Sequence, residues 1–187
     1  MGSEDKDRWD EKHAASNEEA EPSAFLKYVL EQDSWPLAPG LALDLAAGKG
    51  RNAAFLSAKG FDVEGIDISE VALDAARRRA PRATFIQGDL DEMELGDNRY
   101  DLILNFNFLS RALIPKIKRA LKPCGHIVFE TYLIDQRASG HPQNPDYLLL
   151  HNELLDLFRG FRVLFYREGK FAENSEAAYR ASLFARK

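Results

Sequence analysis

Residues 41–53 constrain the fold of this chain more than any other segment. They read as a short apolar run, a turn of small residues that contains Gly48 and Gly50, and the start of a helix. A second apolar run follows and ends in a carboxylate at Asp67. A buried strand, a tight turn, a helix and a neighbouring strand with an acidic tip outline the nucleoside-binding half of a doubly wound sheet. The segment therefore predicts a site for an adenosine-type cofactor.

Small residues at the turn would let a ligand approach the backbone closely. They are Ala46, Ala47, Gly48 and Gly50. The helix that follows would direct its free N–H groups toward the same ligand. The carboxylate oxygens of Asp67 can accept hydrogen bonds from a ribose diol. The alternative for Asp67 is a carboxylate that only ends its strand and caps the helix beginning at Ser69.

Strands and helices alternate along most of the chain. Strands are expected at 41–45, 62–66, 83–87, 101–105 and 126–132, and helices at about 52–59, 70–79 and 110–121. A further helix is expected to open at Pro22 and Ser23. Such alternation predicts a parallel sheet with right-handed crossovers. The apolar runs at 102–104 and 127–129 do not alternate with polar residues, which places them in the middle of the sheet.

The last third of the chain changes pattern. After a helix near 152–158, two apolar runs at 161–166 and 178–185 are separated by a polar interval that contains Gly169. Two strands joined by a short polar segment predict an antiparallel hairpin. The predicted fold is therefore α/β: a doubly wound, mostly parallel, Rossmann-like sheet of seven strands that ends in an antiparallel hairpin.

Charge is concentrated at the N-terminus. The first 24 residues carry eight acidic and three basic residues, which accounts for the whole net charge of −5. We therefore separate an acidic arm, residues 1–21, from a single folded domain at 22–187. The arm contains one large aromatic residue, Trp9, which either folds over the cofactor as a lid or docks on a helix groove. The remainder is neutral and lacks a basic stripe, so nucleic acid is not an expected partner.

Other features narrow the class of protein. The sequence shows neither the apolar block of a signal peptide nor a membrane-spanning run, so a cytoplasmic location is expected. Cys124 is the only cysteine and the four histidines show no ligand spacing, so no metal is expected. Gly48-Lys49-Gly50 has glycine where a phosphate loop needs Ser or Thr, which argues against phosphoryl transfer.

Five segments carry further motifs. They are Asp44-Leu-Ala-Ala-Gly48-Lys-Gly50, Gly65-Ile-Asp67-Ile-Ser69, Gln87-Gly-Asp89-Leu90, Tyr100-Asp-Leu-Ile-Leu-Asn105 and Ala120-Leu-Lys-Pro-Cys-Gly125. In this order, and with the final hairpin, they resemble the class I S-adenosylmethionine-dependent methyltransferases over residues 22–187. The Trp9-Asp-Glu start and the Gly50-Arg-Asn52 run resemble the small bacterial tellurite-resistance type. Ala46 and Cys124 depart from the pattern, because the family usually has glycine at both positions.

The resemblance implies S-adenosylmethionine as the cofactor. It implies that Asp67 binds the ribose, Asp44 the methionyl ammonium directly or through water, and Asp89 the adenine amino group. The alternatives are that Asp44 accepts N–H bonds from its own turn and that Asp89 is a simple turn residue. The cofactor-binding residues predicted in this way are Asp44, Ala46, Ala47, Gly48, Gly50, Asn52, Asp67, Ile68, Asp89, Leu90 and Asn105.

The methyl acceptor is expected at the carboxyl ends of the later strands, where doubly wound sheets bring their substrates. Asn107 and Arg111 follow the fourth strand, Tyr132 ends the fifth, and His141 and Tyr147 lie in a loop stiffened by prolines. Helix capping and solvation are the alternatives for Asn107 and Arg111, and solvation is the alternative for His141. No catalytic base is assigned, because methyl transfer from a sulfonium depends mainly on alignment.

The expected function is methyl transfer from S-adenosylmethionine to a small-molecule acceptor by in-line displacement. An NAD(P)-dependent oxidoreductase is an alternative, since it shares the glycine turn and the acid on the second strand, although the terminal hairpin disfavours it. A second alternative is a non-enzymatic regulator that binds the nucleoside cofactor.

Overall fold

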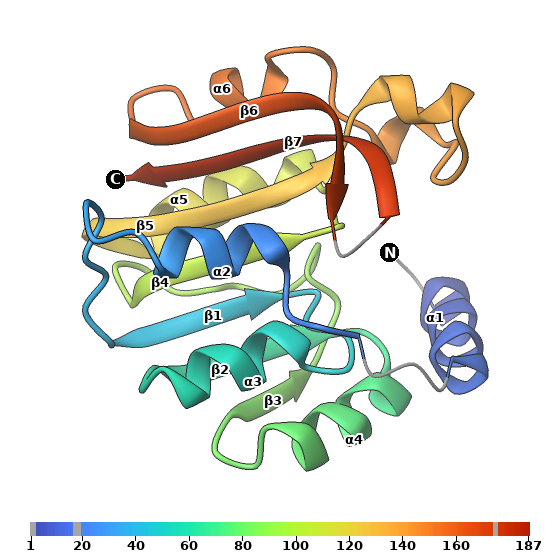
Figure 1. The fold of residues 1–187 in the computed structure, drawn as a ribbon. Helices are drawn as coiled ribbons and strands as arrows, with labels where there is room; N and C mark the ends of the chain where they lie inside the picture. Colours follow the sequence, from blue (N-terminus) through green and yellow to red (C-terminus); the bar gives the residue numbers. More distant parts are fainter. Residues whose placement is uncertain (1–2, 17–19, 174–175) are drawn as a thin grey trace.

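The computed structural model of this protein describes residues 3–16, 20–173 and 176–187. Its centre is a seven-stranded sheet with the strand order β3-β2-β1-β4-β5-β7-β6 (Figure 1). β1 to β5 are parallel, and β7 runs antiparallel to both of its neighbours. The predicted fold class is confirmed. The strands are β1 (Leu41–Leu45), β2 (Asp62–Asp67), β3 (Thr84–Gln87), β4 (Tyr100–Phe106), β5 (Leu121–Tyr132), β6 (Arg162–Glu173) and β7 (Glu176–Arg186).

Helices cover both faces of the sheet, and each face has its own buried apolar cluster. One cluster contains side chains of α2, α3 and α4, and the other contains side chains of α5 and α6. The α-helices are α1 (Ser3–Ala15), α2 (Ala24–Leu30), α3 (Arg51–Ala58), α4 (Glu70–Arg79), α5 (Ile114–Ala120) and α6 (Glu153–Leu157). The 3-10 helices are η1 (Arg111–Leu113), η2 (Ile134–Ala138) and η3 (Pro145–Tyr147). Within the described ranges, none of the helices is long and apolar enough to cross a membrane.

Serine residues set the start of two helices. The hydroxyl of Ser23 accepts hydrogen bonds from the N–H groups of Phe25 and Leu26, and the hydroxyl of Ser69 accepts one from Ala72. These bonds satisfy donors that the first turn of a helix leaves without partners. Both helix starts agree with the sequence prediction.

The helix predicted at about 110–121 forms as η1 followed directly by α5, over residues 111–120. The predicted start of the following strand is wrong, because β5 begins at Leu121, five residues earlier than expected. Pro123 favours extended backbone in this segment, because a proline disfavours helical backbone at the residue before it, here Lys122.

The hairpin strands are also longer than predicted. β6 continues through the polar residues after Arg167 to Glu173, past Gly169 at φ 133°. Figure 1 shows this part of the hairpin bending away from the rest of the sheet. Side chains there do not alternate between a core and solvent, so the sequence lacks the period-two pattern that marks a half-buried strand.

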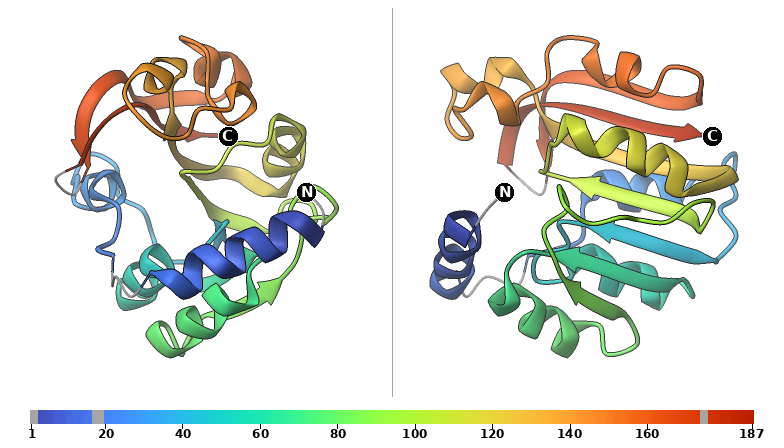
Figure 2. Two further views of the ribbon diagram at one scale, coloured as in Figure 1. Left: turned by 90° about the vertical axis from the view of Figure 1, so that its right-hand side faces the viewer. Right: turned by 180° about the vertical axis from the view of Figure 1, so that it is seen from behind.

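α1 forms within the predicted acidic arm, where the sequence indicated no helix. It lies across the carboxyl ends of β1 to β3 and against α4 (Figure 2). Residues 1, 2 and 17–19 of the arm lie outside the described part of the chain. The position of α1 places the arm at the same edge of the sheet as the predicted cofactor loops.

Candidate functional site

A cavity of about 330 Å³ lies at the carboxyl edge of the sheet, between the strand ends and α1. This volume falls within the range of pockets that hold small molecules. Most of the predicted cofactor-binding residues line it. They are Asp44, Ala46, Ala47, Gly48, Asn52, Asp67, Ile68 and Leu90. The three loops after β1, β2 and β3 therefore meet at one place.

The turn after β1 adopts left-handed backbone at three positions. Ala46 has φ 51°, Gly48 has φ 53° and Gly50 has φ 73°. The turn is fixed to β2 by the N–H of Ala47, which donates to the carbonyl of Ile66 at 3.0 Å. Gly48 faces the cavity. The small residues of this turn thus bring the backbone itself to the cavity wall.

Gly50 contributes to helix packing and not, as predicted, to the wall of the cofactor site. It does not line the cavity in the described structure, and a Cβ at this position would lie 2.8 Å from the Cβ of Ala76. Real Cβ atoms do not approach so closely, so the glycine allows the start of α3 to pack against α4. Its contribution to the site is to set the position of the turn.

Asp67 ends β2 with its carboxylate in the cavity wall and only 7% of the residue exposed. Oδ2 accepts a hydrogen bond from the N–H of Gly48 at 2.8 Å, and Oδ1 accepts one from the N–H of Ser69 at 2.9 Å. A carboxylate has about four acceptor positions. The two backbone donors therefore orient the group and leave further acceptor positions for a ligand.

Asp44 ends β1 in the same cavity and is 2% exposed. Its Oδ2 has no hydrogen-bond partner among the described residues. Burial raises the pKa of Asp44 to about 7, while Arg51 and the N–H of Ala53 favour the ionised form and Asp67 opposes it. A buried acceptor without a donor suits a cationic ligand group, since burial of an unpaired carboxylate is costly.

Three other predicted residues shape the site through contacts with the chain. Asn52 lines the cavity, and its Oδ1 accepts a bond of 2.9 Å from the N–H of Ser23, which joins α2 to α3. Asn105 donates to the carbonyl of Phe108 at 2.7 Å and fixes the loop after β4. Asp89 accepts from the N–H of Asp91 at 3.0 Å in the turn after β3. In the described structure, neither Asn105 nor Asp89 lines the cavity.

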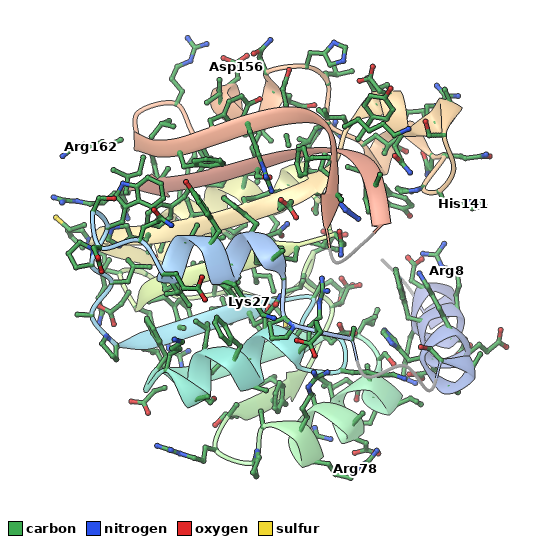
Figure 3. All side chains as sticks on the ribbon, in the orientation of Figure 1. Arg8, Lys27, Arg78, His141, Asp156 and Arg162 are labelled. Carbon is green, nitrogen blue, oxygen red and sulfur yellow. The ribbon has the colours of Figure 1, made fainter. Side chains whose placement is uncertain are left out.

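The residues predicted to bind the methyl acceptor do not lie together in the structure. Asn107 lines the cavity, with left-handed backbone at φ 55°. Arg111 instead pairs with Glu153 at 2.6 Å and donates to backbone carbonyls of the segment before α6. Tyr132, His141 and Tyr147 lie outside the described cavity wall, and Figure 3 shows His141 on the segment after β5, apart from α1.

Sequence reasoning missed His13, Phe106 and Phe108, which also line the cavity. Phe106 and Phe108 flank Asn107 but read as strand and loop hydrophobes. His13 follows Trp9 by one helical turn, and both belong to α1. Residues four positions apart share one face of a helix, so the spacing of Trp9 and His13 would place them together. This inference requires that the segment be helical, which the sequence did not indicate.

A second polar cluster lies beside the cavity, on β5 and the hairpin. Phe106, Glu130, Ser182 and Arg167 are aligned across four strands. Glu130 is fully buried and accepts hydrogen bonds from the hydroxyl of Ser182 and, at 3.5 Å, from Arg167. One step further along, Arg180 donates to the hydroxyl of Tyr132 at 3.0 Å. In the described ranges, no group of three or more His, Cys or acidic side chains is positioned to hold a metal ion.

Comparison with known proteins finds similarity to methyltransferases. A model of the methyltransferase domain matches residues 42–125, which contain the glycine turn and both cavity carboxylates. Over this segment the chain is similar to methyltransferase domains. The chain is 31% identical over 106 residues to an uncharacterized methyltransferase of Synechocystis, covering 52% of this chain and 50% of that protein. It spans about half the length of the curated relatives that match it first.

Two further matches cover more of the chain. Probable S-adenosyl-L-methionine-dependent methyltransferase TehB of Haemophilus influenzae is 24% identical over 168 residues, or 81% of this chain and 58% of TehB. Its crystal structure superimposes with a TM-score of 0.69. A second solved structure has a TM-score of 0.76 at 18% identity, and the match covers 97% of this chain and 92% of the other chain. That structure is described as conversion of a disulfide bond into a thioacetal group during echinomycin biosynthesis. At these identities the structural matches support the fold alone.

Proposed function

We propose that this protein transfers a methyl group from S-adenosylmethionine to a small-molecule acceptor. One observation carries the proposal: the loops that follow β1, β2 and β3 line a single cavity with two carboxylates, Asp44 and Asp67. S-adenosylmethionine, when bound, supplies a methyl group attached to a positively charged sulfur. The residues fit this cofactor because the cavity offers acceptors for a diol and for an ammonium group.

Each carboxylate has a distinct role in the proposal. Asp67, held by two backbone N–H groups, accepts hydrogen bonds from the ribose hydroxyls. Asp44 pairs with the methionyl ammonium through its Oδ2, which gives this buried oxygen the donor that it lacks among the described residues. The turn at Ala46 to Gly48 lets the ligand lie against the backbone.

The chain's task in the reaction is alignment. Phe106, Asn107 and Phe108 line the cavity at the end of β4, and they would position the acceptor against the methyl group. Alignment of two reactants can supply on the order of 7–11 kcal/mol in favourable cases. An acceptor that is already a nucleophile needs no base, so we assign none.

Thermal unfolding with added ligands tests the proposal. S-adenosylmethionine and S-adenosylhomocysteine should each raise Tm, by about 5–10 °C at 100 times their Kd, because a ligand that binds only the native state stabilises it. NAD should leave Tm unchanged. Stabilisation by NAD alone would overturn the proposal. Binding of the sulfur nucleosides without turnover on a panel of thiol, amine, hydroxyl and oxyanion acceptors would favour the regulator instead.

A further inference from the structure

α1 supplies two aromatic side chains to the wall of the cavity. Trp9 and His13 both line it, and their ring centroids are 5.8 Å apart at an interplanar angle of 28°. The ring of His13 lies against the glycine turn, since its Cε1 would be 3.6 Å from a Cβ placed on Gly48. The outer helix therefore closes one side of the space between the loops.

A small set of polar contacts holds α1 in this position. Oδ1 of Asp10 accepts a hydrogen bond of 2.6 Å from the hydroxyl of Ser69 and one of 3.4 Å from the N–H of Val71. Both donors belong to the N-terminus of α4, where a carboxylate is favoured by the free N–H groups and the helix dipole. Beyond the helix, Lys49 donates to the carbonyl of Ser16.

The same contacts connect α1 with the proposed ribose acceptor. Ser69 donates its hydroxyl to Asp10 and its backbone N–H to Oδ1 of Asp67. One residue thus contacts the docked helix and the cavity carboxylate together. A ligand that holds Asp67 in place would therefore also hold Ser69, the residue to which Asp10 binds.

We infer that α1 is part of the cofactor site: Trp9 and His13 contact the bound nucleoside, and Asp10 is the positioning residue that docks the helix. This inference rests on the proposed function. Apart from Trp9, the residues of α1 are polar, charged or alanine, and Trp9 remains half-exposed. Contact with a nucleoside would bury more of the indole, so ligand binding and helix docking should strengthen each other.

Fluorescence of Trp9 tests the contact directly. The chain has two tryptophans, so a Trp35→Phe background leaves Trp9 as the only one. Trp35 packs against Phe184 and Phe165 in the apolar cluster of α2 and does not line the described cavity, and phenylalanine preserves much of that contact. We expect S-adenosylhomocysteine to change the emission of Trp9 and to reduce its quenching by iodide. The midpoint of both changes should equal the Kd from calorimetry.

A matched pair of variants tests the docking contact. Asp10→Ala removes the bonds to Ser69 and Val71 together with a local pair to Lys6, whereas Asp5→Ala removes a carboxylate of the same helix whose partner among the described residues is local, Arg8 at 2.7 Å. We expect Asp10→Ala to weaken S-adenosylhomocysteine binding by about 2- to 30-fold, the range for loss of a helix cap. Asp5→Ala should leave Kd unchanged.

The outcomes separate this inference from the proposed function. Binding of S-adenosylhomocysteine with no change at Trp9, and with equal Kd in the Asp10 and Asp5 variants, would overturn the inference and leave the proposed function standing. Failure of the unmodified protein to bind S-adenosylhomocysteine would overturn both. Tm of both variants without ligand checks that the sheet remains folded.

Discussion

The two halves of the sheet place their buried carboxylates in different surroundings. In the half formed by β1 to β3, Asp67 is oriented by backbone donors, and Oδ2 of Asp44 lacks a partner within the described structure. In the half formed by β5 and the hairpin, Glu130 accepts bonds from Ser182 and Arg167. The first arrangement presents acceptors to a cavity, whereas the second joins neighbouring strands.

The two arrangements should therefore contribute to different properties, the first to ligand binding and the second to the stability of the fold. An acceptor held ready for a ligand contributes little to folding, and a buried carboxylate oxygen without a donor opposes it. A buried carboxylate whose donors come from other strands of the sheet stabilises the association of those strands. Substitutions in the first half should therefore change ligand affinity most, and substitutions in the second should change the free energy of unfolding.

The largest expected effect belongs to Asp67→Ala. Loss of a charge-assisted bond to a ligand hydroxyl should raise the Kd for S-adenosylhomocysteine about 10- to 150-fold, measured by isothermal titration calorimetry. Asp62→Ala is the matched control, because Asp62 begins the same strand and is exposed. Equal Kd values for the two variants would break the assignment of this half to ligand binding.

Ser182→Ala tests the other half. Its hydroxyl is buried and donates to Glu130, so its removal should lower the free energy of unfolding by about 1–3 kcal/mol. Urea unfolding measures this change, and Kd for S-adenosylhomocysteine should stay constant. Ser57→Ala is the control, because the Ser57 hydroxyl is buried with no partner in the described residues and its loss should cost nothing. A neutral Ser182→Ala would contradict the proposed division.

The pH dependence of affinity sharpens the comparison further. Burial raises the pKa of Asp44 to about 7. An ammonium group pairs with the ionised carboxylate, so below that pKa binding must first remove a proton. The Kd for S-adenosylhomocysteine should thus be about tenfold higher at pH 6 than at pH 8. Calorimetry at the two pH values gives the ratio.

Two controls isolate Asp44 in that experiment. Methylthioadenosine lacks the ammonium group, so its Kd should not follow this titration, and Asp44→Asn should abolish the pH effect. The stability of the free protein should change in the opposite sense. Because the folded-state pKa is raised, the free energy of unfolding should fall by on the order of 2–4 kcal/mol as pH rises from about 4 to about 7. A pH-independent Kd would exclude the ammonium pairing.

The sequence predicted the strands and the cofactor loops because these depend on local signals. Apolar runs, Ser69 and the glycine turn each act within a few residues, and the parallel order follows from the alternation. The two apolar runs predicted for the middle of the sheet do form β4 and β5, next to each other. These parts of the fold follow from short-range chemistry.

Other parts depend on contacts between distant residues, which spacing alone does not reveal. α1 has no continuous apolar stripe, and its docking depends on Asp10 meeting Ser69, 59 positions away. Arg111 was predicted to bind the methyl acceptor, but its side chain instead pairs with Glu153, 42 positions away. A polar residue in a loop can serve a ligand or another loop equally well, and only the folded path decides between them.

The smallest expected effects concern the two positions at which this chain departs from the family's glycines. Ala46 and Cys124 both adopt left-handed backbone, at φ 51° and 65°. That conformation costs a non-glycine residue about 1–2 kcal/mol. Glycine removes this cost from the folded state, but it also gives the unfolded chain more conformational entropy, which offsets part of the stabilisation. Each change to glycine should therefore stabilise the protein by no more than about 1 kcal/mol.

The pair also separates the cavity from the rest of the fold. Ala46 lines the cavity, whereas Cys124 is exposed and lies outside the cavity wall in the described structure. Urea unfolding should show a similar gain for Ala46→Gly and Cys124→Gly, and calorimetry should show a changed Kd for S-adenosylhomocysteine only in Ala46→Gly. Cys124→Ala keeps a Cβ and should show no gain. A gain as large in Cys124→Ala would mean that the thiol, and not the backbone, is the source of the strain.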